Sequence, residues 1–263
     1  MSLNKIKAIA LQEYFIILRT LETMVDIFVF PLVSIALFGF LSNYLIGNVK
    51  SDIGHGMLMG MILWQVMYII QYSVTVGSLW NIWSKNLTNI FVSPISSLEY
   101  LIAHSLSGLV KAGIILALSH IICVWLFQTS IFSVGVINLM LFTINLAVFA
   151  IALGVSILGM IFRYGTRIQS LAWGFLGVLQ PLTASFYPVS ALPQPLQYIS
   201  YTLSPTYIFE GMRSALQNPS IIQWNYIIPA FFMNASFFII SIVFFNHMFK
   251  KSKESGQFAR NEG

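Results

Sequence analysis

The sequence predicts an all-α membrane protein with six transmembrane helices, preceded by an amphipathic helix at the membrane interface. Hydrophobic residues make up 57% of the 263-residue chain and charged residues only 8%, whereas a soluble domain carries about 25% charged residues. A membrane-spanning helix needs about 20 mostly apolar residues. The chain has long windows without Asp, Glu, Lys or Arg, at residues 27–49, 53–84, 112–162, 168–209 and 214–249.

The first expected element is an amphipathic helix over residues 3–21, within an N-terminal segment 1–26 that shows no cleavable signal. At 100° per residue one face carries an apolar stripe, formed by Leu3, Ile6, Ala10, Tyr14, Ile17 and Leu21. Lys5, Gln12 and Arg19 lie opposite. This pattern predicts a helix lying in the membrane interface. A helix packed on the spans gives the same pattern.

Six spans are predicted, over residues 27–44, 57–79, 107–127, 139–162, 168–187 and 226–249. With the N-terminus inside, the cytoplasmic side receives eleven basic residues: Lys5, Lys7, Arg19, Lys85, Lys111, Arg163, Arg167, Lys250, Lys251, Lys253 and Arg260. Lys111 belongs to this set if its side chain snorkels to the inner interface. The outside receives only Lys50 and Arg213. Because Lys and Arg accumulate on the cytoplasmic side, both termini are predicted to be cytoplasmic.

The loop between the second and third spans, residues 80–100, is the longest on the predicted cytoplasmic side. Its first half can form a short helix that ends before Pro94, because the residue before a proline avoids helical angles. Ser96 and Glu99 have the spacing of a capping box, which predicts the start of the next helix. A short helix here is either a docking element or a simple connector.

A bounded polar segment, SPTYIFEGMRSALQNP, lies between the fifth and sixth spans, on the predicted outer side. Ser204 is the expected N-cap, with Pro205 in the first turn. Ile208, Met212, Ala215 and Leu216 form its apolar stripe, and Thr206, Glu210, Arg213 and Gln217 form the opposite face. Upstream, three prolines interrupt an apolar stretch. Non-helical backbone at membrane depth must be buried or line a wet cavity, so a re-entrant segment is expected; the alternative is a solvated hairpin.

Motifs for catalysis or metal binding are missing. The chain has no Gly-rich loop ending in Gly-Lys and no HExxH motif. Its four histidines are scattered, so no metal site is predicted. The basic residues lie near span ends, so the net charge of +5 does not indicate a nucleic-acid partner. One alternative is an intramembrane serine protease that uses Ser156, and another is an ATP-independent channel.

Two segments carry a family resemblance. LTNIFVSPISSLEYLIA (87–103) and FYPVSALPQPLQYISYTLSPTYIFEGMRSAL (186–216), together with the N-terminal amphipathic helix ahead of six spans, resemble the permease subunit of ABC-2 type transporters. That group includes polysaccharide, teichoic-acid, nodulation-factor and drug exporters. The resemblance covers nearly the whole chain and implies one transmembrane domain over 1–263.

The resemblance implies an exporter in the bacterial or archaeal inner membrane, built from two permease copies, expected as a homodimer, and two P-loop ATPase subunits that bind ATP and Mg. The permease itself would bind no cofactor and catalyse no reaction. The expected coupling helix comprises Lys85, Asn86, Leu87, Thr88, Asn89, Ile90 and Phe91. The expected external gate lies within 184–219 and includes Tyr187, Pro188, Pro205, Glu210 and Arg213. The expected cargo is amphiphilic: a lipid-linked glycan, or a hydrophobic drug or lipid.

Overall fold

The structure, a computed structural model, describes residues 2–48 and 51–256. These residues form helices joined by short turns, and none of them forms a strand. Lys50 and Arg260, both used in the prediction of orientation, lie outside the described residues. The long helices are α3 (Phe30–Asn48), α4 (Ser51–Trp83), α6 (Ser97–Phe127), α7 (Val136–Tyr164) and α11 (Trp224–Glu254). The short elements are α1 (Leu3–Arg19), α2 (Leu21–Met24), η1 (Val25–Val29), α5 (Leu87–Val92), η2 (Ile131–Val134), η3 (Gly165–Ile168), α8 (Leu171–Leu182), η4 (Val189–Ala191), α9 (Gln194–Ser200) and α10 (Ser204–Gln217).

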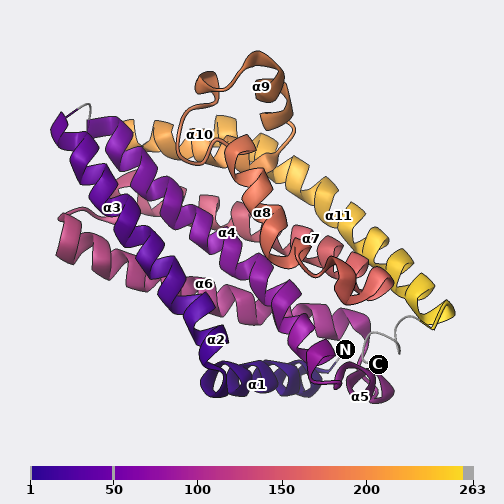
Figure 1. Cartoon of the computed structure of the whole chain (residues 1–263). Coiled ribbons are helices and arrows are strands. Elements are labelled where there is room, and N and C mark those ends of the chain that lie inside the picture. The colour runs from indigo at the N-terminus through magenta and orange to yellow at the C-terminus, as the bar shows by residue number, and fades with distance from the viewer. Residues whose placement is uncertain (1, 49–50, 257–263) are drawn as a thin grey trace.

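The chain runs back and forth along one bundle (Figure 1). α1 and α5 lie at one end, and α9 lies at the opposite end. Within residues 2–48 and 51–256, five helices are long and apolar enough to cross a membrane, each at least 27 residues long including its helical extension. The all-α membrane architecture predicted from the sequence is therefore confirmed.

The fifth predicted span differs from the expectation of residues 168–187. Its helix, α8, has 12 residues, or about 18 Å at 1.5 Å per residue, against a hydrocarbon core of about 30 Å. Pro181 lies in the last turn of α8. The left-handed backbone of Ala184, at φ 53°, then turns the chain away. The residues that follow the helix, Thr183–Ser185, are non-helical and buried.

α4 and α7 form the centre of the bundle, and most of their residues are buried. Glycines allow the helices to approach closely, as is common between membrane helices. A Cβ on Gly154 of α7 would lie 2.9 Å from Val74 Cβ of α4. A Cβ on Gly159 would lie 3.1 Å from Phe245 Cα of α11. α7 therefore packs tightly against both neighbours.

α3, α6 and α11 surround this centre, and most of their residues are not buried. They expose large apolar side chains, such as Phe40, Trp125 and Ile239. Such a surface is unfavourable in water and favourable in hydrocarbon. The outer helices therefore face lipid.

Candidate functional site

The predicted coupling helix is present as α5, although it is shifted by two residues from 85–91. Lys85 has a left-handed backbone, at φ 56°, and lies in the turn before the helix. Asn86 is the N-cap residue, and the helix itself runs from Leu87 to Val92. Leu87 and Ile90 are buried.

One face of this segment points away from the protein. Lys85, Asn89 and Val92 are exposed, Val92 to 81%. Asn89 and Val92, three residues apart, lie on one side of the helix, and Lys85 lies in the turn before it. A small surface of one cation, one amide and one apolar side chain is thus presented at this end of the bundle.

Aromatic packing fixes α5 to the spans. The ring of Phe91 lies 5.3 Å from those of Tyr100 in α6 and Phe249 in α11, and 6.4 Å from that of Phe162 in α7. Aromatic pairs at such distances add about 0.5 to 1.5 kcal/mol each beyond the area they bury. Phe91 therefore connects the short helix to three long helices.

The capping box predicted at Ser96 and Glu99 is confirmed. The Glu99 amide donates to Ser96 Oγ at 3.1 Å, and the Ser96 amide donates to Glu99 Oε2 at 2.9 Å. The same carboxylate accepts from the Ser2 amide at 2.7 Å. Lys5 Nζ donates to the Pro94 carbonyl and lies 3.8 Å from Glu99 Oε2. The start of α1 is thereby attached to the loop that carries α5.

The apolar stripe predicted for α1 divides between two environments. Ile6 is buried against the bundle, whereas Leu3, Tyr14 and Leu21 are exposed on the protein surface. α1 ends at Arg19, because Thr20 adopts extended backbone angles. The face turned toward the bundle consists of Ile6, Ile9 and Glu13. A second apolar face, with Leu11, Phe15 and Leu18, remains exposed.

Glu13 is the functional candidate that sequence reasoning missed. Its Oε2 accepts a hydrogen bond from Lys111 Nζ at 2.9 Å, and its Oε1 pairs with His104 Nδ1. Lys111 also donates to Ser73 Oγ of α4 at 3.3 Å. Lys111 is therefore buried and paired, and does not snorkel to the interface as predicted. The available signal was the spacing of Glu13 from Ile6 and Ile9, which places it on their helical face.

A glycine makes room for this charged cluster. A Cβ on Gly77 of α4 would lie 2.4 Å from Glu13 Oε1 and 3.0 Å from His104 Nδ1. Burial alone would raise the pKa of Glu13, but His104 and Lys111 hold it at about 2. Glu13 is therefore ionised at neutral pH, and its charge joins α1 to α6 and α4.

The predicted gate segment is a compact group of short elements, with η4, α9 and α10 in succession. A Cβ on Gly60 of α4 would lie 2.0 Å from the Ser185 carbonyl oxygen, so the turn after α8 rests directly on α4. Pro188 precedes η4, and Tyr187 Oη donates to the Pro181 carbonyl at 2.7 Å. The turn at Thr183–Ser185 is thus packed against protein, as a re-entrant segment requires, whereas Pro188 and residues 190, 191 and 193–195 are exposed.

Glu210 and Arg213, which share the predicted polar face of α10, form an ion pair. Arg213 Nη2 donates to Glu210 Oε1 at 2.9 Å. The same oxygen accepts from the Val189 amide at 2.7 Å. Glu210 therefore fixes η4 against α10.

The rest of α10 corrects two expectations. Ser204 is not the N-cap, which is Leu203; Ser204 Oγ instead pairs with Asn234 Oδ1 of α11. Pro205 does lie in the first turn, but Thr206 of the expected polar face is fully buried. α10 packs on α4, α7 and α11. Residues outside its apolar stripe, such as Thr206, are therefore buried as well.

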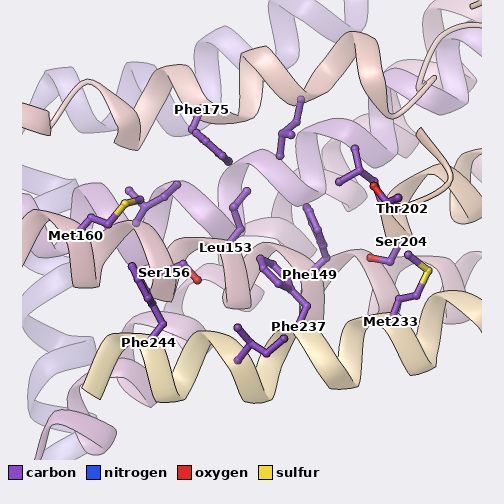
Figure 2. Close-up of a pocket in the computed structure, with 14 residues that line it drawn as sticks. Phe149, Leu153, Ser156, Met160, Phe175, Thr202, Ser204, Met233, Phe237 and Phe244 are labelled. Atoms are coloured by element: carbon purple, nitrogen blue, oxygen red, sulfur yellow. The ribbon is translucent and has the colours of Figure 1, made fainter. Parts of the chain in front are cut away.

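An apolar groove of about 520 Å³ lies between α7, α8 and α11 (Figure 2). Phe149, Leu153, Phe175, Phe237 and Phe244 are among the side chains that line it. Ser156 also lines it, but its Oγ donates to the Ala152 carbonyl of its own helix at 3.0 Å. No histidine, lysine or carboxylate is among the groove's described lining residues, so nothing there activates Ser156 as a nucleophile.

No group of three or more His, Cys, Asp or Glu residues that would hold a metal occurs in the part of the chain that the structure describes. Comparison with known proteins gives one family match. The model of the ABC-2 type transporter family matches residues 4–217. No curated protein matches the chain.

Proposed function

Because the chain belongs to the ABC-2 type transporter family, and is thus the membrane permease of an ABC transporter that works with an ATPase subunit, we propose that it exports an amphiphile from the cytoplasm. Two ATPase subunits bind ATP and Mg, and two copies of this chain form the pathway. The complex lies in the inner membrane of a bacterium or archaeon. Both termini, α1 and α5 face the cytoplasm, in accord with the Lys and Arg distribution.

The observation that carries this proposal is the exposed face of α5. Lys85, Asn89 and Val92 point outward from a helix whose other side is held by Phe91. A short helix that exposes one side and is packed firmly on the other can insert into a cleft of a partner. We assign the receiving cleft to the ATPase. α1 supports the same contact, since Lys5 and Ser2 join it to the α5 loop.

The segment from Thr183 to Gln217 is the external gate in this proposal. Its turn rests on Gly60 of α4, and Glu210 holds η4 to α10. ATP-driven closure of the ATPases moves α5, and the spans carry the displacement to this end of the bundle. The gate opens when α10 shifts relative to α4.

The cargo class follows from the apolar groove between α7, α8 and α11. Its lining contains aromatic and aliphatic side chains with few polar ones. It suits the hydrocarbon part of a lipid-linked glycan, a lipid or a hydrophobic drug. Each buried methylene contributes about 0.8 kcal/mol.

The test is purification of the tagged full-length chain from its native membrane in mild detergent. We expect a P-loop ATPase in equal amount, identified by mass spectrometry. The matched variant replaces Lys85, Asn89 and Val92 by alanine together, and it should lose the ATPase while eluting as the unaltered protein does. A homo-oligomer without a nucleotide-binding partner, repeated in several detergents, contradicts the proposal.

A further inference from the structure

A second cavity, of about 630 Å³, lies at the end of the bundle opposite α1 and α5. Its walls come from four parts of the chain: the start of α4, the α6–α7 connection, the turn after α8 and the end of α10. The lining residues that carry charge or hydrogen-bonding groups are His55, Thr129, Ser133, Tyr187, Arg213 and Gln217. No carboxylate is among the described lining residues.

Arg213 has hydrogen-bonding capacity that the protein does not use. Nη2 donates to Glu210, but Nε and Nη1 are buried and have no acceptor among the described residues. A guanidinium does not lose its proton in a protein. A buried donor without an acceptor costs about 1 to 3 kcal/mol, and more when charged. Such a group calls for an acceptor that the chain itself does not supply.

The groups around Arg213 suit an oxyanion. His55 and the hydroxyls of Thr129 and Ser133 can all donate to oxygen atoms. Glu210, the nearest carboxylate on α10, already accepts from Val189 and Arg213. Glu210 therefore positions the guanidinium. No described residue that lines the cavity carries a negative charge.

The remaining wall is apolar, with Ile53, Phe186, Pro188 and Leu216. The ring of Phe186 packs on that of Phe38 in α3 at 4.6 Å. A cavity with a cation on one side and apolar side chains on the other matches a molecule that joins an anionic group to hydrocarbon.

We propose that this cavity binds a phosphate-type oxyanion through Arg213 and His55. The phosphate is either the headgroup of an amphiphile or free inorganic phosphate. As a statement about cargo, the inference rests on the proposed function, because it makes the exported amphiphile anionic. As a statement about binding, it stands on the cavity alone.

The experiment measures ligand-induced thermal stabilisation of the full-length chain in maltoside, a detergent without phosphate. The probes are inorganic phosphate, dihexanoyl phosphatidic acid, and dihexanoylglycerol as the uncharged control. Arg213→Gln removes the guanidinium, and His55→Phe removes the second donor without disturbing Glu210. The matched control is Arg167→Gln, which removes an exposed arginine at the other end of the bundle.

We expect phosphatidic acid to stabilise the protein and dihexanoylglycerol not to do so. Arg213→Gln should weaken phosphatidic acid binding about 10- to 100-fold, the loss of a hydrogen bond to a charged group. His55→Phe should weaken it less, and Arg167→Gln should leave it unchanged. If inorganic phosphate binds with the same sensitivity to Arg213, the oxyanion alone is recognised; if it does not bind, the headgroup with its hydrocarbon is required.

Two results overturn the inference: no stabilisation by either phosphate compound, or stabilisation that His55→Phe and a folded Arg213→Gln leave unchanged. If Arg213→Gln does not fold, His55→Phe decides the outcome alone. The assay contains neither ATP nor ATPase. A negative result here, with an ATPase still co-purifying, therefore removes the oxyanion site and leaves the proposed function in place.

Discussion

The pair formed by Glu13 and Lys111 allows a quantitative test of how α1 is attached. We consider Glu13→Gln, Lys111→Met and the double variant. The two side chains are 5% and 8% exposed, and their charged atoms lie 2.9 Å apart. Glu13→Gln leaves the Lys111 ammonium buried, with Ser73 Oγ as its remaining acceptor among the described residues.

Removal of one partner of a buried ion pair costs about 3 to 5 kcal/mol, since the other charge stays buried without its counterion. Each single variant should therefore lose about that much free energy of unfolding. The double variant removes both charges and should cost about as much as one single variant. The resulting coupling energy is about 3 to 5 kcal/mol, at or above the upper end for contacting residues.

The assay is equilibrium unfolding in mixed micelles, followed by tryptophan fluorescence from the six Trp residues of the chain. The control pair is Lys250 and Glu254, whose charged atoms lie 3.9 Å apart with side chains 79% and 61% exposed. Lys250→Met and Glu254→Gln should show coupling below about 0.5 kcal/mol. If the losses for Glu13→Gln and Lys111→Met are additive, with a coupling energy as small as that of the control pair, the buried-pair interpretation is refuted.

Three further predictions concern the same end of the bundle. The pKa of Glu13 is lowered from its ordinary value of 4.5 to about 2 in the folded protein, so its contribution to stability is present above about pH 4.5 and is lost as the pH falls toward 2. Unfolding titrations should show this acid loss in the unaltered protein and not in Glu13→Gln. Gly77→Ala should destabilise the protein by about 1 to 3 kcal/mol in the same assay, because its Cβ collides with Glu13 Oε1; an unchanged midpoint would contradict the close approach. Replacing Lys85, Asn89 and Val92 by alanine should abolish the permease's effect on ATP hydrolysis by the ATPase while leaving the unfolding midpoint unchanged; an intact effect would exclude α5 as the coupling element.

Local signals in the sequence predicted the local structure well. Ser96 and Glu99 form the predicted capping box because both groups lie within one helical turn and need no distant partner. Pro94 ends the short helix for a similar reason, since its ring restricts the residue before it. Long apolar windows identified the five long helices of the described residues, because a helix satisfies its backbone hydrogen bonds within a single segment in hydrocarbon.

Features that depend on distant contacts were missed. Glu13 is buried because His104 and Lys111, 91 and 98 residues away, supply its partners. Ser204 was a plausible cap, but Asn234 competes for its hydroxyl. A helical periodicity of side chains specifies which residues share a face, and it does not specify which face meets another helix. The sequence therefore left open which residues of α1 contact the bundle, and the structure places Ile6, Ile9 and Glu13 there.

α1 is attached to α6 at two places, with Ser2 and Lys5 at Glu99, and Glu13 at His104 and Lys111. Ser2 and Glu13 are 11 positions apart, which corresponds to about 16 Å along a helix. A rod held at two separated points cannot swing about either one. Any force on α1 at the membrane surface therefore displaces α6 as a unit, and through Ser73 it reaches the central helix α4 without passing along the α2–η1 connection.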